Sequence, residues 1–238
     1  MQGTHITVAA PGDSSFRAYL AEPRKGSGPG IVLLQEIFGV NQYIRDVADH
    51  YAEEGYVVLA PDLFWRLEPN VELTEVQFEK AFSLYKKFDV PKAVQDIGAT
   101  IAALRGRSTC NGKIGALGFC LGGALAYLSA AYCDVDCAVG YYGVGIESML
   151  DLVPQIKCPL LLHFAAEDKF VPEAARNQVK AAFAGNPVAD IHVYAEVDHA
   201  FARPGGHAYS EFAAKTAHSR SIAHFRNAIG PHLNRSGP

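Results

Sequence analysis

Two hydrophobic patterns alternate along the chain: short, nearly continuous apolar runs, and longer stretches that are apolar on one helical face. Short apolar runs are typical of buried strands, and the longer stretches are typical of amphipathic helices. Their alternation predicts a mostly parallel, twisted sheet with helices on both faces, an α/β fold. Strands are expected over Ile6–Ala9, Arg17–Ala21, Gly30–Leu34, Val57–Pro61, Ile114–Phe119, Cys137–Tyr142, Leu160–Phe164 and Asp190–Tyr194. Helices are expected over Gln42–Glu54, Glu75–Phe88, Pro91–Leu104, Gly122–Tyr132, Glu173–Ala184 and Tyr209–Ala228.

No linker, repeat or low-complexity segment interrupts this alternation, so residues 1–238 are expected to form a single domain. One long stretch, from Asp62 to Thr74, matches neither pattern. Because long irregular connections in compact domains often carry function, this stretch is the expected place for a wall or lid of an active site.

The composition is that of an ordinary globular protein, with 49% hydrophobic residues, 19% charged residues and a formal net charge of −4. Without a basic patch, nucleic acid is not an expected partner. The first eight residues lack a charged segment followed by an apolar core, and no run approaches the roughly 18 apolar residues of a membrane span. We therefore expect a cytoplasmic protein with no membrane partner.

The five cysteines follow neither a disulfide-scaffold pattern nor a Cys-x-x-Cys pattern, which fits a reducing compartment. Cys133 and Cys137 are spaced like two metal ligands, but no second pair and no suitably spaced histidine accompany them. They are therefore interpreted as structural residues, and neither a metal nor a cofactor is expected.

The segment Gly118-Phe119-Cys120-Leu121-Gly122 follows an apolar run and passes directly into a helix-forming segment. This is the strand, tight turn and helix of a nucleophile elbow, with cysteine at the position usually held by serine. Such a turn strains its central residue, and the helix N-terminus favours a thiolate. Taken alone, the pattern fits a buried structural cysteine equally well.

The chain also provides the partners that a nucleophilic cysteine needs. Asp168 follows the strand predicted over Leu160–Phe164, and His199 follows the strand predicted over Asp190–Tyr194. The order of nucleophile, acid and histidine is that of α/β-hydrolases, and such groups gather at the carboxyl ends of parallel strands. Cys120 would then attack a carbonyl carbon, His199 would move protons, and Asp168 would orient the imidazole.

Two backbone N–H groups are candidates for the oxyanion hole. That of Leu121 comes directly after the nucleophile, and that of Ile37 lies in the loop after the strand expected over Gly30–Leu34. Glu167 and Asp198 are interpreted as a solvated neighbour and a local cap. His163 and His192 fall inside predicted strands, where a histidine bonded within the core or sheet is the simpler interpretation.

With these motifs in place, the chain resembles the dienelactone hydrolase, or carboxymethylenebutenolidase, family of the α/β-hydrolase fold. The matching motifs lie between residues 35 and 203, and the cysteine-centred elbow together with Gln-Glu-Ile-Phe-Gly is the most specific of them. They are residues 35–41, 61–63, 118–124, 138–145, 168–172 and 199–203. The resemblance implies hydrolysis of a lactone of the 4-carboxymethylenebut-2-en-4-olide type to maleylacetate, in the degradation of aromatic compounds.

The resemblance also implies roles for four further residues. Glu36 matches a buried carboxylate that holds the resting thiol and takes its proton when substrate arrives. Arg203 matches an arginine that binds the substrate carboxylate. Tyr141 lies where the family has a pocket tyrosine, and Phe38, in the same motif as Glu36, is a further candidate for substrate binding.

The chain departs from the family at a second arginine, which clamps the substrate carboxylate from the start of the helix that precedes Lys87-Phe88-Asp89. Ungapped alignment places Phe78 there, with Lys80 two residues on. Because one arginine beside a phenylalanine makes a looser and more apolar site than two, the preference for carboxylated lactones is expected to be weaker. Neutral esters should also be accepted.

Two alternatives remain open at this point. The chain could be a thiol esterase or peptidase acting on another small acyl substrate, which the missing arginine favours. It could also be a catalytically silent α/β-hydrolase domain that serves as a binding module, for which a broken triad would be expected. A redox enzyme is disfavoured because no resolving cysteine lies near Cys120 in sequence. The expected partner is a small lactone or ester, and the expected state is a monomer.

Overall fold

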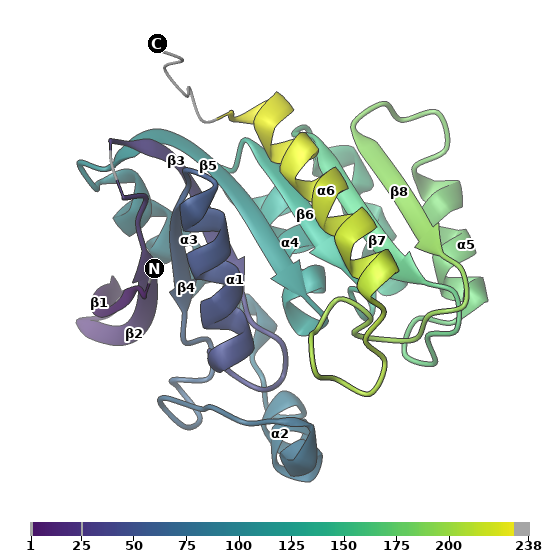
Figure 1. The fold of residues 1–238 in the computed structure, drawn as a ribbon, viewed down its shortest axis with the longest axis horizontal. Coiled ribbons are helices and arrows are strands. Elements are labelled where there is room, and N and C mark those ends of the chain that lie inside the picture. Colours follow the sequence, from purple (N-terminus) through teal and green to yellow (C-terminus); the bar gives the residue numbers. More distant parts are fainter. Residues whose placement is uncertain (1, 25, 231–238) are drawn as a thin grey trace.

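The computed structural model of the chain describes residues 2–24 and 26–230, in which eight strands form one sheet (Figure 1). The strand order is β1-β2-β4-β3-β5-β6-β7-β8. Pairing is antiparallel from β1 through β2 to β4 and parallel from β4 to β8. The strands are β1 (Thr4–Ala10), β2 (Ser14–Ala21), β3 (Gly28–Leu34), β4 (Val57–Pro61), β5 (Cys110–Phe119), β6 (Cys137–Tyr141), β7 (Leu160–Ala165) and β8 (Ala189–Tyr194).

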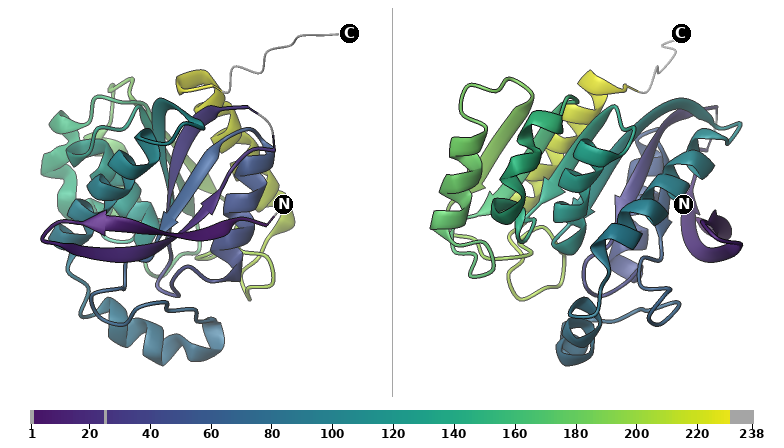
Figure 2. Two further views of the ribbon diagram at one scale, coloured as in Figure 1. Left: turned by 90° about the vertical axis from the view of Figure 1, so that its left-hand side faces the viewer. Right: turned by 180° about the vertical axis from the view of Figure 1, so that it is seen from behind.

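Helices cover both faces of the sheet, as the alternation of patterns predicts (Figures 1 and 2). One buried cluster joins the sheet to α1 (Gln42–Glu53) and α6 (Glu211–Ala228). The other joins the sheet to α3 (Val90–Arg105), α4 (Leu121–Tyr132) and α5 (Glu173–Ala182). The predicted mostly parallel sheet with helices on both faces is confirmed. A 3-10 segment, η2 (Ile146–Gln155), was not expected from the sequence.

Side-chain caps set several helix boundaries. Asn41 accepts a hydrogen bond from the backbone N–H of Ile44 at 3.3 Å, and Asp89 accepts one from that of Lys92 at 3.1 Å. Each cap satisfies an N–H group that a helix start leaves without a partner. Of the described helices, none combines the length and the apolar character that crossing a lipid bilayer requires.

The single helix expected over Glu75–Phe88 is wrong in its extent. The segment begins as a 3-10 turn, η1 (Glu75–Gln77), continues as α2 (Phe78–Tyr85) and then leaves the helical path before α3. Because Asp89 must adopt an extended conformation to cap α3, the two helices cannot be continuous. In Figure 1, α2 lies below the carboxyl ends of the parallel strands, outside the sheet.

The irregular stretch from Asp62 to Thr74 is fastened to its neighbours. The buried carboxylate of Asp62 accepts hydrogen bonds from the backbone N–H groups of Phe64 at 3.0 Å and Asn70 at 2.6 Å. The Leu73 N–H donates to the Phe38 carbonyl at 2.9 Å, which ties the stretch to the loop after β3. Its role is to carry the chain to η1 and α2, which stand at the carboxyl edge of the sheet.

Candidate active site

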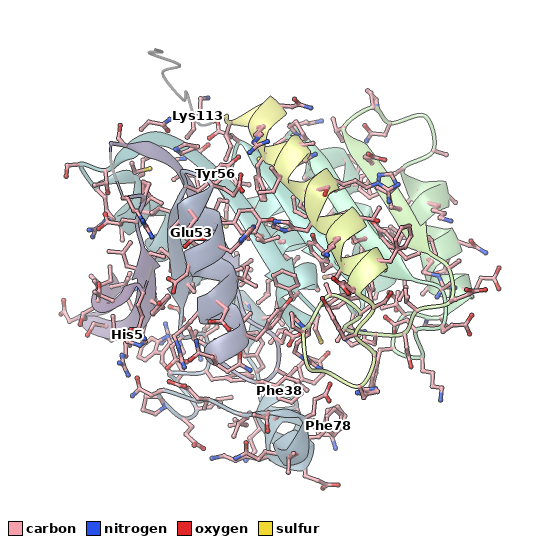
Figure 3. The ribbon with its side chains drawn as sticks, viewed as in Figure 1. His5, Phe38, Glu53, Tyr56, Phe78 and Lys113 are labelled. Atoms are coloured by element: carbon pink, nitrogen blue, oxygen red, sulfur yellow. The ribbon has the colours of Figure 1, made fainter. Side chains whose placement is uncertain are left out.

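A cavity of about 460 Å³ opens at the carboxyl ends of the parallel strands, between the strand tips and α2. Figure 3 shows two of its lining residues, Phe38 and Phe78, at this same end of the molecule. The lining residues come from the loops after β3, β5, β6, β7 and β8, from the start of α4, and from η1 and α2. They are Glu36, Ile37, Phe38, Glu75, Phe78, Phe82, Tyr85, Cys120, Leu121, Val144, Lys169, Phe170, Asp198, His199, Ala200, Arg203 and His207.

Cys120 stands at the turn between β5 and α4 with a backbone φ of 55° and ψ of −113°. A non-glycine residue adopts such a conformation only when its surroundings impose it. Two flanking glycines permit the tight turn, because a Cβ on Gly118 would strike the carbonyl of Gly122, and one on Gly122 would strike the carbonyl of Leu34. The turn therefore has the geometry of the predicted elbow and presents Cys120 to the cavity.

His199 and Asp168 meet beside Cys120, as their positions after β8 and β7 predict. The Nδ1 of His199 lies 2.7 Å from the Oδ2 of Asp168. The other carboxylate oxygen of Asp168 accepts hydrogen bonds from the backbone N–H groups of Phe170 at 2.8 Å and Val171 at 3.1 Å. With Asp168 buried and bonded on both oxygens, its carboxylate holds the imidazole in one orientation.

The charge state of His199 depends on its two partners. Burial by itself would lower the pKa of this imidazole. Negative charge on Cys120, together with hydrogen bonds to Asp168 and Cys120, outweighs burial and raises the pKa of His199 to about 10. The arrangement therefore favours the imidazolium form of His199 at neutral pH. We call Cys120, Asp168 and His199 the catalytic corner.

The two oxyanion-hole candidates both border the cavity. Leu121 is the first residue of α4, where a backbone N–H has no partner within the helix, and Ile37 lies across the cavity in the loop after β3. Their placement fits two N–H donors near a carbonyl bound at Cys120.

Arg203 joins two carboxylates at the rim of the cavity. Its Nη1 donates to the Oε2 of Glu36, and its Nη2 donates to the Oε1 of Glu75. Glu75 is also approached by the Nδ1 of His207 at 3.1 Å. Burial would lower the pKa of Arg203, but the charge of Glu36 and the hydrogen bonds to both carboxylates raise it. Arg203 is therefore a fixed cation whose terminal nitrogens are each paired.

Glu36 does not hold the thiol here, in contrast to the expectation drawn from the family. Its Oε2 meets Arg203, while its buried Oε1 has no hydrogen-bond partner. Cys120 instead lies next to His199, whose pKa a negative charge on Cys120 raises. The guanidinium of Arg203 balances the charge of this buried carboxylate, so Glu36 orients Arg203 in this structure.

Tyr141 does not line the cavity at Cys120, in contrast to the expectation drawn from the family; it borders a separate cavity beside α1 and α6. Side chains alternate along β6, and Tyr141 shares the face of Cys137 and Val139, which packs against α6. Its hydroxyl lies 2.7 Å from the Oγ of Ser221 in α6. The same Ser221 lies 3.0 Å from the Nε2 of His163, which agrees with the interpretation of His163 as a bonded core histidine.

The other substrate-binding candidates are placed as follows. Phe38 and Phe78 both line the cavity, and the guanidinium of Arg203 lies 5.1 Å from the centre of the Phe38 ring. Lys80 is not part of the lining and pairs with Glu68 at 2.6 Å, so it does not replace the missing arginine. None of residues 62–74, where a wall was expected, lines the cavity; the wall is formed instead by the segment that begins at Glu75.

The sequence analysis did not identify the rest of the wall formed by η1 and α2. We call Glu75, Phe78, Phe82 and Tyr85 the α2 wall; all four line the cavity. The spacing of the three aromatic residues, four and then three positions apart, predicts a common helix face and was an available signal. Glu75 left no such signal, because 128 positions separate it from Arg203.

The chain resembles proteins of known family over nearly its whole length. The model of the dienelactone hydrolase family matches residues 16–229. The carboxymethylenebutenolidase of Pseudomonas putida is 40% identical over 220 residues, covering 91% of this chain and 93% of that protein. Carboxymethylenebutenolidase 1 of Cupriavidus pinatubonensis is 37% identical over 223 residues, covering 92% and 94%. The crystal structure of a candidate dienelactone hydrolase from Klebsiella pneumoniae is 28% identical, with a TM-score of 0.83 and coverage of 94% and 99%.

Proposed function

The chain belongs to the dienelactone hydrolase family, and we propose that it hydrolyses a small lactone or ester through a covalent thioester on Cys120. The observation that carries this proposal is the catalytic corner: a strained cysteine at a helix N-terminus, with His199 and Asp168 joined at 2.7 Å beside it. A cysteine and histidine so arranged, with a carboxylate that orients the histidine, form the machinery of acyl transfer.

In the first half of the reaction, the thiolate of Cys120 attacks the carbonyl carbon and a tetrahedral oxyanion forms. The N–H groups of Ile37 and Leu121 would receive this oxyanion, and one such donor contributes roughly 3–4 kcal/mol to the transition state. The carbon–oxygen bond to the leaving group then breaks, and the imidazolium of His199 gives its proton to the departing oxygen. The product is a thioester on Cys120; for a lactone, the released alcohol stays attached to the acyl group.

In the second half, His199 is a neutral base and takes a proton from water. The hydroxide equivalent attacks the thioester carbonyl, and collapse of the second oxyanion releases the carboxylic acid and the thiolate. Asp168 stabilises the imidazolium in both halves without itself taking a proton. Each turnover therefore consumes one water molecule and restores the starting charges.

Two substrate classes are candidates within this reaction. The relatives' name, carboxymethylenebutenolidase, points to a carboxylated lactone, which the family resemblance would have converted to maleylacetate. Arg203 at the cavity is the residue that would bind its carboxylate. The second class is a neutral ester, which Phe78 in place of a second arginine favours. A peptidase or a silent binding module is less well supported, because all three residues of the catalytic corner are in place.

The proposal is tested by a turnover screen of lactones and p-nitrophenyl esters on the purified protein and on Cys120→Ala. The wild type should turn over at least one class, and Cys120→Ala should lose about 10⁴-fold or more in kcat. Cys133→Ala is the matched control, since Cys133 is half-buried away from the cavity. Wild-type turnover in folded Cys120→Ala would rule out the cysteine mechanism, and binding without turnover would favour the silent module.

A further inference from the structure

We infer that the site selects an uncharged ester or lactone bearing an aromatic ring, because Glu75 occupies the guanidinium edge that a substrate carboxylate would need. This inference rests on the proposed function and specifies its substrate class. It is carried by two features of the α2 wall: the charges around Arg203, and the row of aromatic rings on α2.

The charge argument begins with Arg203. Both of its terminal nitrogens donate to protein carboxylates, and only 10% of its side-chain surface is exposed. A substrate carboxylate would have to displace Glu75, which also interacts with His207, or sit as a third negative charge against Glu36 and Glu75. Like charges brought together in a partly buried site disfavour binding. The site therefore discriminates against anions.

The remaining charges of the lining do not reverse this preference. Of the described residues, three carboxylates line the cavity (Glu36, Glu75 and Asp198), against two permanent cations, Arg203 and Lys169. Lys169 is exposed, so water and salt screen its charge. The imidazolium of His199 is paired with the carboxylate of Asp168. No described cation of the lining is thus both buried and available to a substrate carboxylate.

The aromatic argument concerns the face of α2 that borders the cavity. The rings of Phe78 and Phe82 stack with centres 5.7 Å apart and planes 13° apart, and those of Phe82 and Tyr85 with centres 6.0 Å apart and planes 23° apart. Phe78 and Phe82 remain 41% and 37% exposed. Packing within the protein therefore leaves much of the surface of these two residues, which both line the cavity, uncovered.

A flat ring in the substrate would cover this row. Aromatic rings prefer offset or edge-on contacts with one another, and such pairs contribute beyond the area that they bury. Phe38 and Phe170 line the same cavity from the loops after β3 and β7, so aromatic rings outside the α2 wall are also available to contact the substrate ring. The aromatic group of the substrate is therefore placed against α2, and its reacting carbonyl against Cys120.

The charge half is tested with two esters of nearly equal shape, 4-carbamoylphenyl acetate and 4-carboxyphenyl acetate. The wild type should prefer the neutral ester by about tenfold or more in kcat/KM. Glu75→Gln should bring the ratio of the two kcat/KM values close to one by raising kcat/KM for the carboxylated ester. Glu79→Gln is the matched control: Glu79 is an exposed glutamate of the same helix that does not line the cavity, and it should leave the ratio unchanged.

The aromatic half is tested with methyl 3-phenylpropanoate and methyl 3-cyclohexylpropanoate. Phe82→Leu should lower kcat/KM for the phenyl ester about tenfold while changing that for the cyclohexyl ester less than about twofold. Phe212→Leu is the control, because Phe212 is 84% exposed on α6 and lies outside the cavity.

The inference is overturned if the wild type prefers the carboxylated ester, if Glu75→Gln leaves the ratio unchanged, or if Phe82→Leu affects both propanoates equally. These outcomes differ from failure of the proposed function. In that case the wild type would hydrolyse none of the esters or lactones, or Cys120→Ala would hydrolyse them as fast as the wild type.

Discussion

The catalytic corner and the α2 wall face each other across one cavity, but they are built differently. The corner stands on turns at the ends of β5, β7 and β8, with Asp168 buried and bonded on both oxygens. The wall stands on a short 3-10 turn and an eight-residue helix below the sheet, with aromatic rings about two-fifths exposed. Under the proposed function, reaction chemistry and substrate choice would be carried by separate parts of the molecule.

This separation has a physical reason. The corner needs atoms placed to within a few tenths of an ångström, which strand ends held by the packed sheet can provide. The wall needs only shape, apolar surface and charge, so a helix outside the sheet is sufficient. Changes in the corner should therefore reduce turnover of all substrates together, whereas changes in the wall should alter the ratio between substrates.

The largest effect on turnover of both substrate classes is expected for Asp168→Asn. An amide cannot stabilise the imidazolium or hold the same tautomer, so kcat should fall by about 10³-fold for neutral and carboxylated substrates alike. Steady-state kinetics on both substrate classes measures this. A loss confined to one class would contradict the separation of the two regions.

The pH profile sharpens the same prediction. Because the pKa of His199 is raised to about 10, its imidazolium persists through neutral pH, and kcat/KM should fall only as the pH rises through about 10. Asp168 contributes to that raised pKa, so Asp168→Asn should move the alkaline fall to lower pH. If kcat/KM of the variant fell over the same alkaline pH range as that of the wild type, the fall would arise from the titration of a group other than His199.

A smaller effect, on stability, is expected at the link between the sheet and the wall. Arg203→Met leaves the buried carboxylate of Glu36 without its cation and should lower the free energy of unfolding by about 3 kcal/mol. The double variant Glu36→Gln, Arg203→Met should recover part of this loss. Urea unfolding of the three variants provides the comparison, and a stability equal to that of the wild type in Arg203→Met would show that Glu36 needs no partner.

The smallest effect is expected for Phe78→Arg, which introduces an arginine into the α2 wall near Glu75. Because the new charge is partly exposed and Glu75 competes for it, kcat/KM for a carboxylated dienelactone should rise by no more than about fivefold. Activity on a neutral alkyl ester should stay within about twofold of the wild type. A rise of a hundredfold on the dienelactone would show that Glu75 does not exclude anions.

That Cys120, Asp168 and His199 lie together could be predicted from the sequence because each of these residues is marked locally. The glycines of the elbow, the aspartate after one strand and the histidine after another all lie within short motifs, and parallel strands bring their carboxyl ends together. The same locality explains the close agreement of strand and helix positions with the structure.

What the sequence could not predict depends on contacts between distant residues or on strand parity. The pairing of Glu75 with Arg203 joins positions 128 apart, and no pattern marks it. The orientation of Tyr141, in contrast, could have been predicted, because side chains alternate along a strand and Tyr141 lies on the same face as Cys137 and Val139. The partner of Glu36 could not be predicted from the sequence. The thiol of Cys120 and the guanidinium of Arg203 lie on different loops, and no sequence pattern indicates which of the two binds the Glu36 carboxylate.

The most direct test of the central claim, that Cys120 is the nucleophile, is to follow its alkylation by iodoacetamide alongside turnover. Peptide mass spectrometry gives the labelled fraction of each cysteine, and residual kcat is measured on a neutral ester and on a dienelactone from the same samples. We predict that activity on both substrates falls in proportion to the labelled fraction of Cys120 and is independent of labelling at Cys110, Cys133, Cys137 and Cys158. Retained turnover in enzyme fully labelled at Cys120 would contradict the account.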